Sequence, residues 1–171
     1  MVKYLLQRNK MKIKNIKVRF IFEKDVIVKS NSQIIWRNGK STFSIYKDAR
    51  NFINVTGLKS LQEIKQQKLV VEKLFKQKII TVKIDNIFYS KKDYKNLDMH
   101  SLYSYLKDRK DFFCNYNIEL FAGMILHPAN KNYPTILLFR TGSYTLMGGK
   151  SMKLILESEK FVIDLIRMFE K

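Results

Sequence analysis

An internal repeat is the feature of this 171-residue chain that most restricts its fold. The segment KIKNI at residues 12–16 returns as KIDNI at residues 83–87, which is 71 positions later. The segment VTGLKS at residues 55–60 returns as LMGGKS at residues 146–151, which is 91 positions later. Two copies of one supersecondary unit produce echoes of this kind. Because the two separations differ, the first copy lacks a segment that the second copy contains.

The hydrophobic pattern predicts strands followed by a helix in each half of the chain. In the first half we expect strands within residues 12–28, 41–46 and 52–56, then an amphipathic helix at residues 60–76. In the second half we expect strands at residues 79–88, 120–126, 135–139 and 144–147, a short helix at residues 102–113 and a long helix at residues 151–170. The short helix corresponds to the segment that the first copy lacks.

The chain carries a large excess of positive charge, with 33 Lys and Arg against 15 Asp and Glu, a net charge of +18. Residues 1–85 contribute +14 and residues 86–171 contribute +4. An excess of this size indicates a polyanionic partner, either nucleic acid or an anionic membrane surface. A genome rich in A·T pairs produces the same bias without selection for binding, and Lys outnumbers Arg by 26 to 7. The charge alone leaves these explanations open.

Composition excludes several classes of protein. A chain with 46% hydrophobic residues, six Gly and two Pro is expected to fold rather than to be disordered or collagen-like. No segment approaches the roughly 18 apolar residues of a membrane-spanning helix. The first apolar run is too short for a signal peptide, so we expect a soluble intracellular protein that does not bind a membrane.

The sequence predicts neither an enzyme nor a cofactor. The single Cys114 has no basic neighbour and is expected to be a packed thiol. His100 and His127 are the only histidines, so no metal-binding cluster is predicted. Residues 148–151 (GGKS) lack the upstream glycine of a phosphate-binding loop.

Three motifs follow one another in the second half: ELFAGMI at residues 119–125, ILLFRTGS at residues 136–143, and LMGGK at residues 146–150. Asn15 and Asn86 occupy the same position in the first echo. These residues resemble the TATA-box-binding protein (TBP) family, with its patterns ELFPG(L/I)I, a strand ending in Phe before a Ser-Gly turn, (V/L)TGAK, and paired asparagines. The order of strands and the final helix agree as well, so the resemblance extends over most of residues 12–171.

The resemblance implies an α+β saddle formed by a single domain, residues 1–171. Two pseudo-symmetric repeats, a trimmed one at residues 12–78 and a second at residues 79–171, would form a curved antiparallel sheet with long helices on its convex face. The concave face would bind the minor groove of AT-rich double-stranded DNA and start transcription. The residue bias together with this divergence suggests a large DNA virus or an AT-rich protist as the source, and hence the nucleus or a viral factory as the location.

Family motifs assign DNA-binding roles to several residues of this sequence. Phe121 and Phe139 match the wedges that replace base stacking in the second repeat, although a strand phenylalanine is more commonly a core residue. Asn15 and Asn86 match the family's base-contacting asparagines, although a lone strand asparagine is commonly a turn or edge residue. Thr56 matches a base-contacting threonine, whereas Met147, at the equivalent place, lacks comparable hydrogen-bonding groups.

The first repeat departs further from the family pattern. Its later wedge falls at Tyr46, or at Phe43 if the turn is aligned differently, and no aromatic residue is present at residues 29–32, where the earlier wedge belongs. Strand alternation places Lys17 and Arg19 on the face of Asn15, and Phe88 and Ser90 on the face of Asn86. The two cations would enter a narrow minor groove or contact phosphates.

Partner contacts are implied by resemblance too. Glu119 and Leu120 match the TBP loop that contacts a TFIIB-type factor, which would bring in the RNA polymerase machinery. An alternative is a TBP fold that serves as a protein-interaction or nonspecific DNA-binding module, with TATA recognition lost. Met147 and the missing wedge favour this alternative, whereas Phe121 and Phe139 favour the promoter-binding function.

Overall fold

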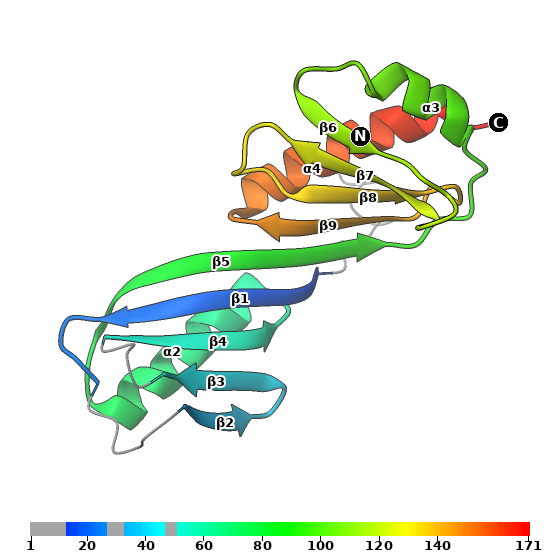
Figure 1. Cartoon of the computed structure of the whole chain (residues 1–171). Coiled ribbons are helices and arrows are strands. Elements are labelled where there is room, and N and C mark those ends of the chain that lie inside the picture. Colours follow the sequence, from blue (N-terminus) through cyan, green and yellow to red (C-terminus); the bar gives the residue numbers. More distant parts are fainter. Residues whose placement is uncertain (1–12, 27–32, 47–50) are drawn as a thin grey trace, which may run out of the picture. The chain divides into compact units, whose positions relative to one another are not determined.

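The structure is a computed structural model that describes residues 13–26, 33–46 and 51–171. The chain divides into two compact units. The N-terminal unit comprises residues 14–86, and the C-terminal unit comprises residues 87–171 together with Ile13. Figure 1 shows the described strands and helices along the chain. Residues 27–28, where a strand is predicted, residues 29–32 and residues 47–50 lie outside the described part.

In the N-terminal unit the described strands are β1 (Ile13–Phe22), β2 (Ile34–Asn38), β3 (Ser41–Ile45), β4 (Phe52–Leu58) and the start of β5 (Ile79–Lys91), and the helix is α2 (Leu61–Phe75). The helix begins where Ser60 Oγ accepts a hydrogen bond from the Glu63 amide at 3.1 Å, a capping arrangement that satisfies one of the free N–H groups of the first turn. Strand β2 was not predicted, because nearly all of its side chains are exposed and do not alternate.

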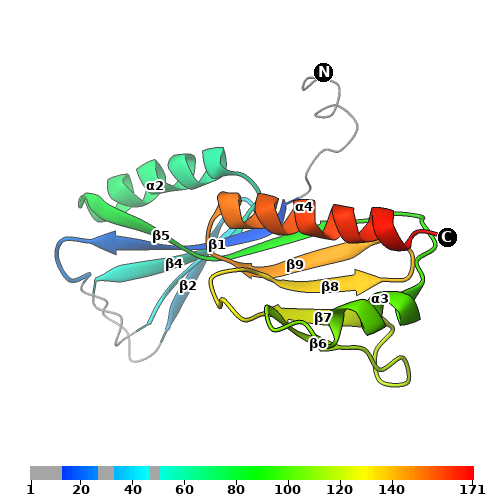
Figure 2. The ribbon, with the colours of Figure 1, turned by 90° about the horizontal axis from the view of Figure 1, so that it is seen from above.

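In the C-terminal unit the described elements are the end of β5, α3 (Met99–Leu106), β6 (Phe112–Asn115), β7 (Gly123–Pro128), β8 (Thr135–Phe139), β9 (Tyr144–Gly149) and α4 (Met152–Phe169). The short helix is therefore shorter than predicted. Its predicted end lies instead in β6, where Phe112 pairs with Pro128 and Phe113 with His127. The hydrogen-bonding order of the strands is β2-β3-β4-β1-β5-β9-β8-β7-β6, and Figure 2 shows α2 and α4 each lying along one face of its own unit.

Both units contain a β-bulge at the same place in their ladders. The partners on either side of the bulge are Ile16↔Leu58 and Val18↔Val55 in one unit, and Ile87↔Gly149 and Tyr89↔Leu146 in the other. These pairs are related by the separations of 71 and 91 residues seen in the sequence echoes. At the bulges Gly57 has a φ of +88° and Gly148 a φ of +86°, a region that glycine adopts without steric cost.

Gly57→Ala is expected to destabilise the protein by about 3 kcal/mol, because the positive φ and a steric contact act together. A Cβ at this position would collide with the carbonyl oxygen of Lys40. Gly148→Ala is the matched control, since its φ is nearly the same but no heavy atom lies within 4 Å of the added Cβ. We expect it to cost about 1 kcal/mol. Urea unfolding measures both changes, and equal losses would contradict the steric contribution.

The core of the N-terminal unit lies between its strands and α2. Side chains of β1 at Ile16, Val18, Phe20 and Phe22 are fully buried, and they alternate with half-buried ones as expected for a sheet with one covered face. From the helix, Ile64 and Val71 are buried, and Phe75 packs against Phe22 with ring centroids 5.8 Å apart. The opposite face of these strands is therefore not covered by α2.

The core of the C-terminal unit contains a buried carboxylate. Glu159 of α4 is 9% exposed, and its Oε1 accepts hydrogen bonds from the hydroxyl groups of Tyr89 and Tyr144, each at 2.6 Å. The two tyrosines are almost fully buried. This contact fixes α4 on the helix-facing side of β5 and β9, because a buried carboxylate needs hydrogen-bond donors.

Stability is expected to fall in alkaline solution. Burial, and next the hydrogen bond to Glu159, raises the pKa of Tyr89 and of Tyr144 well above the ordinary value of 10.0. Above that pH the unfolded chain loses protons that the folded chain keeps, so folding stability falls by about 1.4 kcal/mol per pH unit for each tyrosine. Urea unfolding measures the free energy of unfolding from pH 9 to 11.5. This free energy should fall less steeply with pH in Tyr144→Phe than in the wild type. It should fall as in the wild type in Tyr94→Phe, because Tyr94 is 90% exposed.

Candidate nucleic-acid interface

Each unit has a sheet face that its long helix does not cover, which we call its open face. The C-terminal open face consists of the side chains that alternate with buried ones: Phe88, Ser90, Phe113, Asn115, Ile125, His127, Thr135, Leu137, Phe139, Thr145 and Met147. Strand pairing brings them into rows, for example Asn115, Ile125, Leu137, Thr145 and Ser90. The centre of this face is apolar, with short hydroxyl side chains at its β9 and β5 end.

Phe121 and Phe139 lie together beside this face. Their ring centroids are 5.7 Å apart and the rings are inclined by 66°. Gly123 pairs with Phe139 across β7 and β8, and a Cβ at residue 123 would lie 2.8 Å from the Phe121 ring and 2.9 Å from the Phe139 ring. The glycine therefore leaves the space that the two rings occupy. Phe121 remains 39% exposed, so part of its ring is accessible to a ligand.

Asn86, Phe88 and Ser90 follow one another on one side of β5. All three are half-buried, and they alternate with the buried Ile87 and Tyr89. Asn86 ends the N-terminal unit, whereas Phe88 and Ser90 belong to the C-terminal unit.

The N-terminal open face is polar. Asn15, Lys17 and Arg19 of β1 are half-buried and alternate with the fully buried Ile16 and Val18. The Asn15 side-chain oxygen accepts a hydrogen bond from the Gly57 amide at 2.7 Å. Asn15 thus stabilises the bulge in β4, a structural role that its sequence position did not indicate.

Arg19 is bound on this open face by an acidic residue that sequence reasoning missed. Its guanidinium donates three hydrogen bonds of 3.0–3.2 Å to the Asp85 carboxylate, and it lies 4.8 Å from the centre of the Phe52 ring. The side chain of Asp85 is only 14% exposed. Because Asp85 is 66 positions away in sequence, no local pattern predicts the pair. The positive charge of Arg19 is therefore offset within the face.

The two alternatives for the later wedge of the first half lie on different sides of the sheet. Phe43 is fully buried and stacks on Trp36, with ring centroids 4.9 Å apart, so its placement at a wedge is wrong. Tyr46 is 49% exposed. Ser44 pairs with Asn54, as Leu137 pairs with Thr145 in the other unit. Tyr46 follows Ser44 by two residues, as Phe139 follows Leu137. Tyr46 and Phe139 therefore occupy equivalent positions in the two units.

Thr56 and Met147 are both half-buried. Thr56 pairs with Thr42, and Met147 pairs with Thr135, so each occupies an open-face row beside a threonine.

Glu119 and Leu120 lie in the loop between β6 and β7. Leu120 is 84% exposed. Asn117 orders the loop, since its carbonyl oxygen accepts hydrogen bonds from the Leu120 and Phe121 amides and its side-chain oxygen accepts one from the Glu119 amide. Ile118 is 64% exposed as well, which the sequence did not indicate. The loop therefore presents two exposed aliphatic side chains, of which Leu120 shares a small pocket with Phe121.

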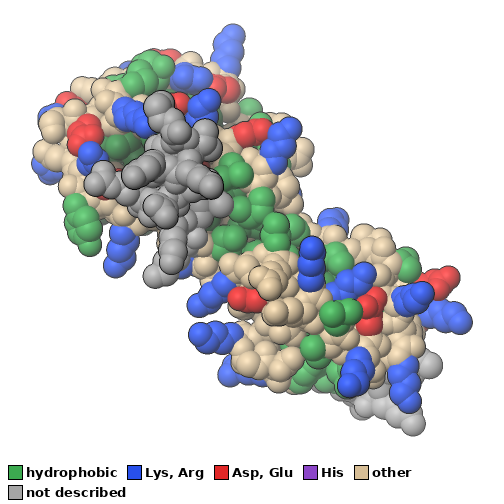
Figure 3. Space-filling model, turned by 180° about the vertical axis from the view of Figure 1, so that it is seen from behind, with side chains coloured by type: hydrophobic (Ala, Val, Ile, Leu, Met, Phe, Trp, Pro, Cys, Tyr) green, Lys and Arg blue, Asp and Glu red, His purple; other side chains and the backbone are tan. Residues whose placement is uncertain are grey.

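Positive charge is not confined to the open faces. In Figure 3, which shows the side hidden in Figure 1, Lys and Arg side chains are spread over each unit.

Among the described residues, no group of three or more His, Cys, Asp or Glu could hold a metal ion, and no helix is long and apolar enough to cross a membrane. Burial raises the pKa of the Cys114 thiol to about 11, so it stays protonated near neutral pH.

Comparison with known proteins agrees with the motifs. The family described as transcription factor TFIID, or TATA-binding protein, matches residues 81–169, just over half of the chain. No curated protein sequence matches the chain. Among solved structures, TBP of Methanococcus jannaschii matches with a TM-score of 0.69 and 17% identity, over 94% of this chain and 99% of that one. The predicted α+β TBP-like fold is thereby confirmed, and the chain belongs to the TATA-binding protein family.

Proposed function

We propose that this protein binds the minor groove of AT-rich double-stranded DNA with its open faces and acts in transcription initiation. The observation that supports the proposal most strongly is the pair Phe121 and Phe139, which is held over Gly123 at the border of an apolar sheet face. Two adjacent rings next to such a face suit insertion between base pairs, where an apolar side chain replaces the lost base stacking.

The remaining open-face residues suit the same ligand in different ways. In the C-terminal unit, Thr145 and Ser90 offer hydroxyl groups next to an otherwise apolar row, and A·T base pairs present acceptors in the minor groove. In the N-terminal unit Lys17, with Arg19 once it is released, would contact phosphates, and Asn15, Asn86 and Thr56 would contact base edges. Tyr46 would stack at the later wedge position of the first repeat. These assignments treat residues 12–78 and 79–171 as two repeats of one TBP-like domain, each with its own open face.

The experiment that tests the proposal compares opposite sides of one unit with the same substitution. Leu137 lies in the centre of the C-terminal open face, and Leu156 is 46% exposed on α4. Fluorescence anisotropy with an AT-rich duplex should show that Leu137→Glu abolishes binding, because the new carboxylate opposes the DNA, and that Leu156→Glu binds like the wild type. Equal effects of the two variants, or equal wild-type affinity for AT-rich and GC-rich duplexes, would refute minor-groove recognition by this face.

Asp85→Asn is expected to strengthen DNA binding several-fold and to make it less selective. Without the carboxylate, Arg19 becomes available to phosphates, and one additional phosphate contact steepens the log–log dependence of affinity on salt by about 0.9. Asp164→Asn is the matched control, because it removes the same charge from an exposed ion pair on α4. The measurement is a salt titration on AT-rich and GC-rich duplexes. An unchanged salt slope for Asp85→Asn would mean that Arg19 does not reach DNA.

A second candidate function is supported by the Arg19–Asp85 pair itself. A TBP fold that serves as a protein-interaction module would not require a free cation on the N-terminal face. Met147 favours the same candidate, since it replaces a hydrogen-bonding side chain.

Under either function we propose that Leu120, which is 84% exposed next to Glu119, contacts a TFIIB-like factor. This factor would recruit RNA polymerase in the nucleus or, for a viral protein, in a viral factory. Pull-down of such a factor by wild type and by Leu120→Asp tests the contact.

A further inference from the structure

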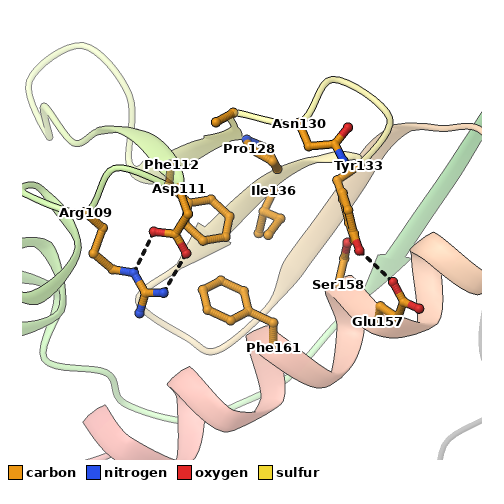
Figure 4. A pocket seen from close by; sticks show the side chains of 11 residues that line it. Arg109, Asp111, Phe112, Pro128, Asn130, Tyr133, Ile136, Glu157, Ser158 and Phe161 are labelled. Atoms are coloured by element: carbon orange, nitrogen blue, oxygen red, sulfur yellow. Dashed lines mark hydrogen bonds and ion pairs between the residues drawn. The ribbon is translucent and has the colours of Figure 1, made fainter.

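A pocket of about 470 Å³ lies on the helix side of the C-terminal unit. Phe112 of β6 and Phe161 of α4 stack in it, with ring centroids 4.9 Å apart and ring planes within 9° of parallel. Ile136 of β8 lines the pocket with them, and Figure 4 shows the three side chains between the strands and the helix. Phe112 and Ile136 belong to the rows that face α4, so the pocket opens away from the open face.

Two polar pairs border the apolar floor on opposite sides, as Figure 4 shows. On one side the Arg109 guanidinium donates hydrogen bonds of 2.8 and 2.6 Å to the Asp111 carboxylate. On the other side the Tyr133 hydroxyl donates a hydrogen bond of 2.8 Å to the Glu157 carboxylate. The Asp111 charge is offset by Arg109, and Lys153 Nζ lies 3.9 Å from a carboxylate oxygen of Glu157. These neighbouring cations lower the repulsion of the two acidic lining residues toward an incoming anion.

The exposed residues that adjoin the pocket lining in sequence are mostly basic. Lys110, Lys131 and Lys160 each directly follow or precede a residue of the lining, and all three are exposed. One exposed acidic residue, Asp108, stands in the same relation to the lining. The lysines come from three different segments, namely the turn before β6, the β7–β8 loop and α4, so they do not all follow one helix face.

We propose that this pocket binds an acidic segment of a partner protein, with one large aromatic or aliphatic side chain of that segment inserted into the pocket against Phe112, Ile136 and Phe161. The inserted side chain gains from leaving water in a preformed apolar site, as anchor residues of protein interfaces do. The lysines hold the carboxylates on either side of the anchor and select acidic over basic segments. The proposal does not depend on DNA binding, because the two surfaces use opposite sides of the unit.

The first test uses three short fluorescein-labelled peptides and the full chain. One peptide contains several Asp and Glu around a single Trp, the second has Ala in place of Trp, and the third has Asn and Gln in place of the acids. Fluorescence anisotropy should show binding of the first peptide and at least about tenfold weaker binding of each of the others. Equal affinity for the Trp and Ala peptides would overturn the anchor, and equal affinity for the acidic and amide peptides would overturn the charge selection.

The second test localises the binding. The triple variant Lys110→Glu, Lys131→Glu, Lys160→Glu should weaken the acidic Trp peptide at least about tenfold more than Lys59→Glu, Lys65→Glu, Lys73→Glu, which changes the same charge on the other unit. Ala129→Trp, which places a ring at the exposed border of the pocket, should remove the advantage of the Trp peptide. Equal weakening by the two triple variants would reduce the binding to general electrostatics and refute the pocket. Circular dichroism establishes that each variant is folded.

A third measurement separates this proposal from the proposed function. Addition of an AT-rich duplex should leave the affinity for the acidic Trp peptide within about twofold, since the pocket and the open face do not overlap. Displacement of the peptide by DNA would place the peptide on the open face and overturn the proposal. If the protein binds no duplex at all, DNA binding fails but the peptide measurements above stand unchanged.

Discussion

Replacement of both Phe121 and Phe139 with alanine is expected to weaken binding to an AT-rich duplex on the order of 100-fold. Stacking of an aromatic side chain on a base is worth about 1–3 kcal/mol, so the loss of two rings costs roughly 3 kcal/mol of binding free energy. The bend in the bound duplex should decrease as well, because no ring remains to separate the base pairs. Anisotropy measures the affinity, and energy transfer between dyes at the two duplex ends measures the bend.

Phe113→Ala is the matched control for this prediction. Phe113 is 68% exposed on the same open face, but it lies on β6, away from the pair of rings over Gly123. Its removal should change affinity only a few-fold and leave the bend unchanged. Gly123→Ala adds an intermediate case, since it keeps both rings and only displaces them. A bend that is the same in wild type and in the double variant would rule out the wedges.

The second large effect is on stability: Glu159→Ala is expected to lower the free energy of unfolding by about 3 kcal/mol. The substitution leaves the hydroxyl groups of Tyr89 and Tyr144 buried without their acceptor, and each unsatisfied group costs about 1–3 kcal/mol. Urea unfolding monitored by circular dichroism measures the change.

The chain supplies its own control for Glu159. Glu157, two positions earlier on α4, accepts a hydrogen bond from Tyr133 at 2.8 Å, but this pair is exposed. Glu157→Ala should therefore cost less than about 1 kcal/mol, because water replaces the lost partner. The double variant Tyr89→Phe, Tyr144→Phe would leave the Glu159 carboxylate without the two tyrosine hydroxyl donors. We expect it to lower the free energy of unfolding at least as much as Glu159→Ala. Similar small losses for all three variants would show that the buried carboxylate does not stabilise α4.

The sequence predicted the elements whose hydrophobic period is long and regular. The residues of α4 repeat with the helical period, and β1 alternates between buried and half-buried positions, so their type and face followed from pattern alone. The type of α2 followed as well, but its buried face did not, because Leu69 and Leu74 are 67% and 60% exposed whereas Val71 is buried. The short helix was extended too far because Leu102, Leu106 and Phe113 fit one helix face. In the structure Phe113 pairs with His127 in a strand instead. Tertiary pairing overrides local period in segments as short as this one.

The candidate site was predictable only where a motif is local. Phe121, Gly123 and Phe139 lie within two short motifs, and their mutual contact follows from one strand pair. The Arg19–Asp85 pair and the bond from Gly57 to Asn15 join residues 66 and 42 positions apart, and both were missed. Single-sequence patterns carry no information on which distant side chains meet, and this limit applies most strongly to charged groups because each has many possible partners.

The chemical difference between the two open faces has a consequence for what each face can recognise. One face carries two adjacent phenyl rings and an apolar row, whereas the other carries an internally paired arginine, lysine and amide groups. Under the proposed function, DNA against the first face would be tested for the ease with which its base pairs unstack. DNA against the second face would be tested for phosphate position and for the hydrogen-bonding groups of its base edges. The two units would then contribute two different kinds of selectivity.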